Sequence, residues 1–155
     1  MKVQDIMTRD VQCCGPDTNL AVAGKMMWDG DCGVLPILNV EGWVLGVITD
    51  RDICMAVATR NKPASAITVW ETVSGKACAC RETDDIHIAL DIMKREKVRR
   101  LPVVDEDGVL QGMLSMNDSV LNAEETKWKK RPDLSYGDVI HTLKAISEHR
   151  VLVGI

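Results

Sequence analysis

The sequence predicts a mixed α/β (α+β) fold made of two pseudo-symmetric β-α-β-β-α units and a C-terminal helical extension. Residues 3–53 align without gaps on residues 69–119, an internal repeat at an offset of 66 residues. The matched positions are mostly apolar residues, turn glycines and one proline, as in Leu35-Pro36 and Leu101-Pro102. A domain as small as one repeat buries only about 60% of its chain surface. We therefore expect the two copies to pair through their apolar faces.

Each element of the first copy has a local signal. A short strand is predicted over Val11–Cys14, and Asp17-Thr18 is typical of a helix cap. Apolar residues recur at helical spacing from Leu20 to Met27, and Gly30-Asp31 ends this helix. The pattern therefore predicts a β-α unit.

The second half of the copy is a hairpin that leads into another helix. Strands are predicted around Leu35–Leu38 and Gly46–Ile48, with a tight turn at Glu41-Gly42. A helix begins in Thr49-Asp50-Arg51-Asp52. The second copy repeats this order, with strands at residues 77–80, 101–104 and 112–114 and helices from residues 86 and 115.

The repeat sets the expected domain boundaries. We predict repeat 1 over residues 1–60, a polar linker containing Pro63 over 61–68, and repeat 2 over 69–123. Residues 124–155 form a non-repeating tail. Within it Glu124–Arg131 is predicted to be helical, and Tyr136–His149 has an amphipathic helical stripe that packs on the module or on a partner.

Composition excludes several classes of protein. The net charge of −4 argues against a nucleic-acid partner, because phosphate backbones require a basic face. The sequence has no run of 18 apolar residues and so predicts no membrane span, and the N-terminus does not resemble a signal peptide. Six cysteines without such a signal favour a reducing compartment. We expect a cytoplasmic protein.

The matched segments Thr49-x-x-Asp52 and Ser115-x-x-Asp118 carry the candidate chemistry. A hydroxyl followed three residues later by a carboxylate is a capping box, and this alone explains both. The same geometry also suits a nucleotide, since a helix N-terminus attracts phosphate and a nearby carboxylate accepts ribose hydroxyls. Both interpretations stay open at this stage.

Several motifs in register resemble a tandem CBS-domain pair, or Bateman module, over about residues 1–123. They are Asp-Ile-Met-Thr at 5–8, Gly-Val-Leu-Pro-Ile at 33–37, Gly-Val-Ile-Thr-Asp-Arg-Asp-Ile at 46–53 and Arg-Arg-Leu-Pro-Val-Val-Asp at 99–105. The resemblance implies two repeats packed sheet to sheet around a pseudo-twofold axis, and a homodimer of modules. It also implies two clefts for adenosine-containing ligands such as AMP, ATP, NAD or S-adenosylmethionine.

The resemblance assigns residues from both repeats to each cleft. The Asp118 cleft is expected to contain Ser115, Asn117, Asp118, Arg99, Arg100, Met7, Asp10, Gln12, Cys32 and Gly33. The Asp52 cleft is expected to contain Thr49, Arg51, Asp52, Val73, Lys76, Cys78 and either Val98 or Arg99. Because Gly33-Val34 stands where the other repeat has Arg99-Arg100, we expect the Asp118 cleft to bind phosphate more strongly. The alternative for the arginines is a solvated strand edge.

No catalytic or metal motif emerges from the sequence. The three histidines are scattered, and Cys13-Cys14 and Cys78-x-Cys80 lack the spacing typical of zinc sites. We therefore expect a regulatory binding module without catalytic cofactor or metal, and not an enzyme. Two alternatives remain open, a structural dimerisation scaffold with empty clefts and, less favoured, a redox-responsive regulator. The regulated protein partner is unknown.

Overall fold

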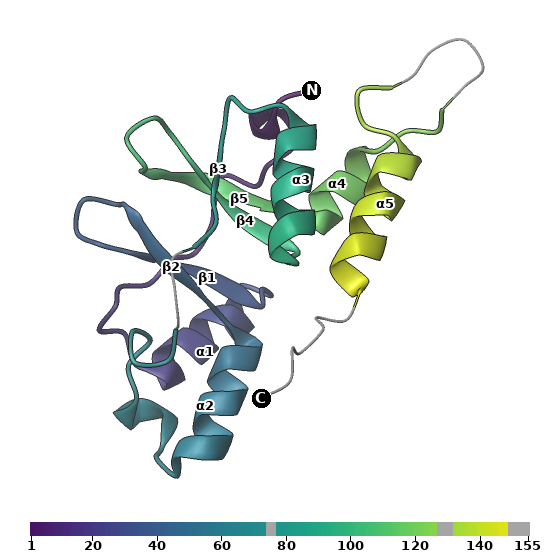
Figure 1. The fold of residues 1–155 in the computed structure, drawn as a ribbon. Helices are drawn as coiled ribbons and strands as arrows, with labels where there is room; N and C mark the ends of the chain where they lie inside the picture. The colour runs from purple at the N-terminus through teal and green to yellow at the C-terminus, as the bar shows by residue number, and fades with distance from the viewer. Residues whose placement is uncertain (74–76, 127–131, 149–155) are drawn as a thin grey trace. The chain divides into compact units, whose positions relative to one another are not determined.

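The computed structural model describes residues 1–73, 77–126 and 132–148, and these residues form two compact units. Unit one contains residues 1–8, 78–103 and 112–155, and unit two contains residues 9–77 and 104–111. Each unit holds helices and a small sheet, so the predicted mixed α/β class is confirmed (Figure 1).

Unit two contains the elements of the first repeat. Helix α1 (Leu20–Asp29) leads to the antiparallel strands β1 (Val34–Leu38) and β2 (Val44–Thr49), and α2 (Asp50–Arg60) follows directly. The 3-10 helix η2 (Ala64–Ala66) packs near α1. The core of this unit is aliphatic, with no exposed surface on Leu20, Leu35, Ile37 and Ile48.

Unit one contains the elements of the second repeat, apart from the hairpin tip at residues 104–111. A three-stranded sheet has the order β3 (Cys80–Arg81), β4 (Arg100–Val104) and β5 (Leu110–Ser115). Helix α3 (Ile86–Glu96) lies between β3 and β4 in the chain, and α4 (Met116–Asn122) follows β5. The N-terminal segment, with its 3-10 helix η1 (Val3–Asp5), buries Val3 and Met7 in the same core.

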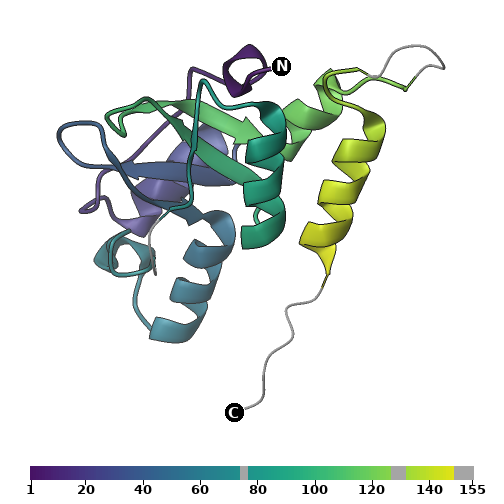
Figure 2. The same ribbon diagram turned by 45° about the horizontal axis from the view of Figure 1, so that its top comes forward.

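The tail adds a fifth helix to unit one. Helix α5 (Tyr136–Ser147) packs mainly against α3 and also against α4, and both ribbon views place it along α3 (Figures 1 and 2). The amphipathic stripe predicted in Tyr136–His149 is therefore a helix that packs on the module itself, with His149 outside the described residues.

The structure differs from several local expectations. The predicted strand at Val11–Cys14 is reduced to one bridge, between Cys14 and Ile37. The cap of α1 is Asn19 rather than Asp17-Thr18, because the Asn19 side chain accepts a hydrogen bond from the Val22 amide.

Two segments outside the helices also differ from the local pattern. Ile67, within the predicted linker, is buried in the core of unit two, and the amide of Leu20 donates to its carbonyl. Glu124 pairs with Ser135 in a β-bridge, and no helix includes residues 124–126. Residues 127–131, the rest of the helix predicted over Glu124–Arg131, lie outside the described residues.

Candidate ligand-binding site

Thr49 and Asp52, the first capping pair, lie where β2 passes into α2. Asp52 Oδ2 accepts hydrogen bonds from the Thr49 amide at 2.9 Å and the Thr49 hydroxyl at 2.7 Å. In return, the Asp52 amide donates to Thr49 Oγ1 at 3.2 Å. The structure therefore contains the reciprocal capping box that the spacing predicts.

Ser115 and Asp118, the second capping pair, have the same arrangement between β5 and α4. Asp118 Oδ2 accepts from the Ser115 amide at 2.7 Å and from the Ser115 hydroxyl at 2.6 Å. The Asp118 amide donates to Ser115 Oγ at 3.2 Å. Hydrogen bonds within both pairs thus engage Oδ2 of the carboxylate, which leaves the two lone pairs of Oδ1 for a ligand.

The surroundings of the two pairs differ in charge. Next to the first pair, the Asp50 carboxylate lies over Gly33, with Oδ2 only 2.9 Å from where a Cβ on this glycine would stand. Asp50 Oδ1 also accepts a hydrogen bond from the Arg51 amide at 2.8 Å. The matching residue in the second repeat is Met116, which is buried in the core of unit one. The first pair thus has a second carboxylate beside it, which the second pair does not have at that position.

Two arginines stand at the start of β4, which contacts the helix of the second pair through the backbone. The carbonyl of Arg99 accepts a hydrogen bond from the Met116 amide at 2.9 Å, and this bond ties the start of β4 to the start of α4. Arg99 and Arg100 both have exposed side chains. Their guanidinium groups are therefore accessible to an anion and are attached to the same unit as Asp118.

The other predicted site residues divide between the two units. Unit one holds Met7, Cys78, Val98 and Asn117, of which Asn117 is exposed and Met7 is buried. Unit two holds Asp10, Gln12, Cys32, Gly33, Arg51 and Val73. Lys76 lies outside the described residues. The meeting of residues from both repeats in one cleft stays a prediction.

The paired cysteines of the two repeats are core residues. Burial, together with the nearby Cys13, raises the pKa of the Cys14 thiol to about 11. Burial and the charge of Asp84 raise the pKa of Cys80 to about 12. Both thiols are therefore protonated at neutral pH and poorly nucleophilic. In the described part of the chain, no group of three His, Cys, Asp or Glu side chains could hold a metal ion.

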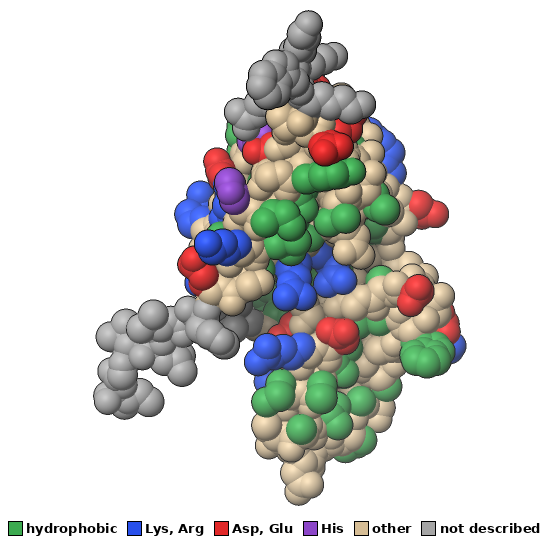
Figure 3. All heavy atoms as spheres, turned by 90° about the vertical axis from the view of Figure 1, so that its right-hand side faces the viewer, with side chains coloured by type: hydrophobic (Ala, Val, Ile, Leu, Met, Phe, Trp, Pro, Cys, Tyr) green, Lys and Arg blue, Asp and Glu red, His purple; other side chains and the backbone are tan. Residues whose placement is uncertain are grey.

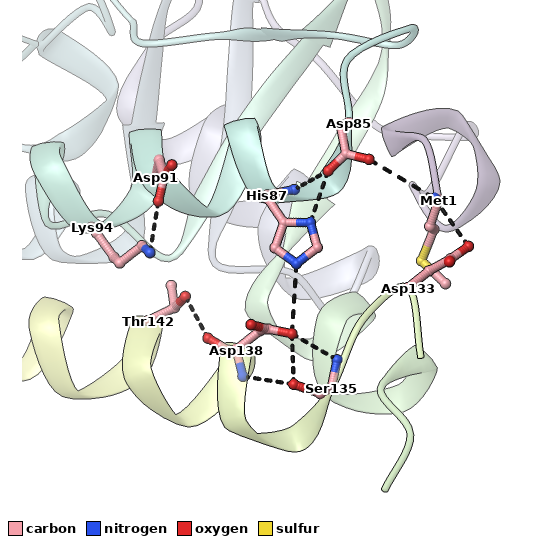
Figure 4. Close-up of polar contacts among 9 residues, drawn as sticks. All are labelled: Met1, Asp85, His87, Asp91, Lys94, Asp133, Ser135, Asp138 and Thr142. Atoms are coloured by element: carbon pink, nitrogen blue, oxygen red, sulfur yellow. Dashed lines mark hydrogen bonds and ion pairs between the residues drawn. The ribbon is translucent and has the colours of Figure 1, made fainter. Parts of the chain in front are cut away.

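Sequence reasoning missed one polar cluster, which lies between α3 and α5. Ser135 and Asp138 form a third capping box at the start of α5, and His87 reaches Asp138 from α3 (Figure 4). The Ser-x-x-Asp spacing at 135–138 was a readable signal for the cap. Nothing local indicated that His87, 51 residues earlier in the chain, would lie beside it.

The comparisons with known proteins agree with the repeat. The family model of the CBS domain matches residues 3–59 and again residues 73–118. The chain is 29% identical over 140 residues to the uncharacterized protein YlbB of Bacillus subtilis, and this match covers 88% of this chain and 93% of YlbB. It is 30% identical over 114 residues to inosine-5'-monophosphate dehydrogenase of Mycobacterium leprae, but this match spans only 21% of that enzyme.

Solved structures of similar fold include proteins with different bound groups. Hypoxic Response Protein I, with two coordinated zinc ions, is 27% identical, with a TM-score of 0.73 over 80% of this chain and 100% of the other. The CBS-domain pair of protein MJ0100, in complex with 5-methylthioadenosine and S-adenosyl-L-methionine, is 23% identical, with a TM-score of 0.70 over 78% and 98%. CBSX2 in complex with AMP is 24% identical, with a TM-score of 0.67 over 77% and 93%.

Among the described helices, none combines the length and the apolar composition that crossing a bilayer requires.

Proposed function

Because the chain belongs to the CBS-domain family, we propose that it is a regulatory module that binds an adenosine-containing ligand in clefts between its two repeats. The observation that carries the proposal is the duplicated capping pair, in which each carboxylate keeps Oδ1 available beside a strand end. The ligands of the similar structures, AMP in CBSX2 and the adenosine compounds in the MJ0100 pair, support the same ligand class. AMP, ATP and NAD are the candidates that we favour.

Asp118 is the proposed ribose-binding residue of the stronger site. A carboxylate oxygen with two lone pairs can accept hydrogen bonds from both ribose hydroxyls. Arg99 and Arg100 would then bind the phosphate, because planar guanidinium groups match phosphate oxygens in a bidentate geometry. Their exposure and their attachment to the same unit as Asp118 support this assignment.

The Asp52 site is the proposed weaker phosphate site. Arg51 is exposed beside it, but the carboxylates of Asp50 and Asp52 both lie at the start of α2. Like charges near a phosphate oppose its binding. A ligand that binds at both sites should therefore bind through its nucleoside part at Asp52 and through nucleoside and phosphate at Asp118.

We also propose that two chains form a cytoplasmic homodimer that transmits ligand occupancy to a protein partner, without catalysis of its own. Figure 3 shows hydrophobic side chains on the face where α5 lies. Exposed apolar residues on α4 and α5 include Val120, Leu121, Tyr136 and Ile140, and α2 exposes Met55 and Val57.

All six cysteines are free, which suits a reducing compartment. The match to inosine-5'-monophosphate dehydrogenase of Mycobacterium leprae spans about a fifth of that enzyme's length, which is consistent with a regulatory part rather than a catalytic one.

A structural scaffold with empty clefts is the second candidate, favoured by one observation. The capping boxes use both the hydroxyl and the carboxylate of each pair, so helix capping alone gives these residues a role. A test must therefore separate capping from ligand binding.

The test is thermal unfolding of the full chain with AMP, ADP, ATP, NAD and S-adenosylmethionine, using Asp118→Asn. Asparagine keeps one oxygen to accept the Ser115 hydrogen bonds, but it loses the charge and the second acceptor. A ligand at about 100 times its Kd adds roughly 2.7 kcal/mol, or several degrees in Tm for a chain of this size. Asp118→Asn should abolish most of this increase, and Asp52→Asn should reduce it less.

One outcome would favour the scaffold, namely that no adenosine compound raises the Tm of the unmodified protein. If Asp118→Asn instead keeps the full increase, the ligand binds away from the second capping pair, and the assignment of Asp118 as the ribose-binding residue is wrong.

A further inference from the structure

Helix α5 packs on unit one through apolar residues. Val139 is buried in the core of unit one, and Leu143 and Ile146 are packed against it. Thr142 has no exposed surface, and its hydroxyl donates to the Asp138 carbonyl at 2.8 Å. The docking of α5 on α3 therefore buries one face of the helix, and a polar contact at its start can adjust how firmly it stays in place.

That polar contact is made by the acidic groups around His87, which lies on the first turn of α3. His87 Nδ1 lies 2.8 Å from Asp85 Oδ1, and His87 Nε2 lies 3.5 Å from Asp138 Oδ2 on α5 (Figure 4). The imidazole ring thus stands between two carboxylates that belong to different helices. Asp85 is the N-cap of α3, and Asp138 is the third residue of α5 in the capping box with Ser135, so both carboxylates are held in place by backbone hydrogen bonds.

The number of protons on the imidazole decides how many of these contacts are attractive. A charged imidazole donates from both nitrogens, so it can contact Asp85 and Asp138 at once. A neutral imidazole has one N–H and one lone pair, whichever tautomer is present. In the neutral form, one of the two carboxylates therefore faces a lone pair instead of a donor.

The two carboxylates stay ionised while an imidazole titrates. Burial raises the pKa of Asp138, but hydrogen bonds from Ser135 and His87 outweigh it and lower this pKa to about 2. Hydrogen bonds from the amide and ring of His87 lower the pKa of Asp85. A histidine changes charge between about pH 5 and pH 8, far above these values.

Other charges near His87 come from each neighbouring segment. The ammonium group of Met1 lies 3.9 Å from Asp85 Oδ2 and 3.2 Å from Asp133 Oδ2, in the loop before α5. On α3 itself, Lys94 pairs with Asp91 at 2.7 Å. The N-terminus of α3 and the Met1 ammonium oppose a positive charge on His87, whereas Asp85, Asp138 and Asp133 favour one.

We propose that His87 is a protonation-controlled latch, and that its charged form holds the start of α5 against α3 while its neutral form weakens this contact. Acidification from pH 7.5 to pH 5.5 should strengthen the docking of α5, and a rise in pH through the same range should loosen it. The latch uses residues of α3 and of the tail helix, which lies beyond the two matched CBS repeats. It does not depend on ligand binding.

The test is amide hydrogen exchange of α5 in the full chain at pH 5.5 and pH 7.5, expressed as protection factors that correct for the pH dependence of intrinsic exchange. In the unmodified protein, α5 amides should be about threefold better protected at pH 5.5, the size expected for a half-exposed ion pair. His87→Gln should remove this difference. His141→Gln is the matched control, because His141 is an exposed histidine on α5 itself, and it should keep the difference.

Equal protection of α5 at both pH values in the unmodified protein would overturn the latch, as would an unchanged pH dependence in His87→Gln. If His87→Gln does not fold, NMR titration of the unmodified protein decides. The amide shifts of Ser135 and Asp138 should then follow the titration of the His87 ring. Shifts that follow His141, or that do not move between pH 5 and pH 8, would refute the proposal.

Discussion

Replacing Arg99 and Arg100 with alanine tests whether the second capping pair has a phosphate site beside it. The double substitution removes two exposed guanidinium groups, and it leaves the Arg99 carbonyl able to accept from the Met116 amide. Hydrogen bonds to charged groups contribute about 1.5–3 kcal/mol, but exposed charges are screened, so we take about 1 kcal/mol for each arginine. The two together should lower AMP affinity about 30-fold.

Adenosine is the informative comparison ligand for this variant. Because it has no phosphate, its affinity should change less than twofold, and the measurement is a calorimetric titration of AMP and adenosine into each protein. In the unmodified protein, raising the ionic strength from about 0.01 M to 0.15 M should reduce the difference in affinity between AMP and adenosine, because salt screens exposed charges.

Arg95→Ala is the matched control for the loss of a positive charge. Arg95 lies on α3 of the same unit, its side chain is 69% exposed, and it pairs with Glu96. AMP affinity should be nearly unchanged in this variant. The reasoning is refuted if the double variant binds AMP as well as the unmodified protein, or if AMP and adenosine lose affinity equally.

Four further expectations concern stability and reactivity. Leu90→Ala should destabilise the protein by about 2–5 kcal/mol in urea unfolding, because Leu90 is only 1% exposed in the core of unit one. The lowered pKa of Asp138 gives stability that is present above about pH 4 and lost as the pH falls through 2. In acid unfolding, Asp138→Asn should therefore remove about 1–2 kcal/mol of the pH dependence of the unfolding free energy. Equal acid sensitivity of the variant and the unmodified protein would contradict this. Gly108→Ala should cost about 1 kcal/mol in thermal unfolding, because φ is +86° at this turn and the space around a Cβ is open. Iodoacetamide should modify the exposed Cys54 in the folded protein and reach Cys80 only on unfolding, as mass spectrometry of digested protein can show.

The parts of the fold that could be predicted from the sequence depend on residues close together in the chain. The capping pairs are the clearest case, because Thr49 and Asp52 are three residues apart and their hydrogen bonds need no other segment. The turn glycines belong to the same class, since Gly42 and Gly108 have the positive φ that a tight hairpin turn requires. The internal repeat then carried each local interpretation from one copy to the other.

Predictions failed where a distant segment decides the outcome. The strand expected at Val11–Cys14 has the right composition, but only Cys14 pairs, because strand formation depends on a partner elsewhere in the chain. Local composition also does not indicate the burial of Ile67, which lies in a polar stretch with Pro63 but belongs to the core of unit two. Its burial depends on contact with α1, which no short window of sequence reveals.

The candidate site divides in the same way. The sequence by itself determined the two Thr/Ser and Asp pairs, because the repeat aligns them and local hydrogen bonds orient the carboxylates. A phosphate site at Arg99 and Arg100 stays a prediction. Only the tertiary structure placed Asp50 over Gly33, buried Met116 at the matching position, and set His87 between Asp85 and Asp138. These arrangements depend on the packing of strands and helices distant in the chain, since the charge around a site is set by which segments pack beside it.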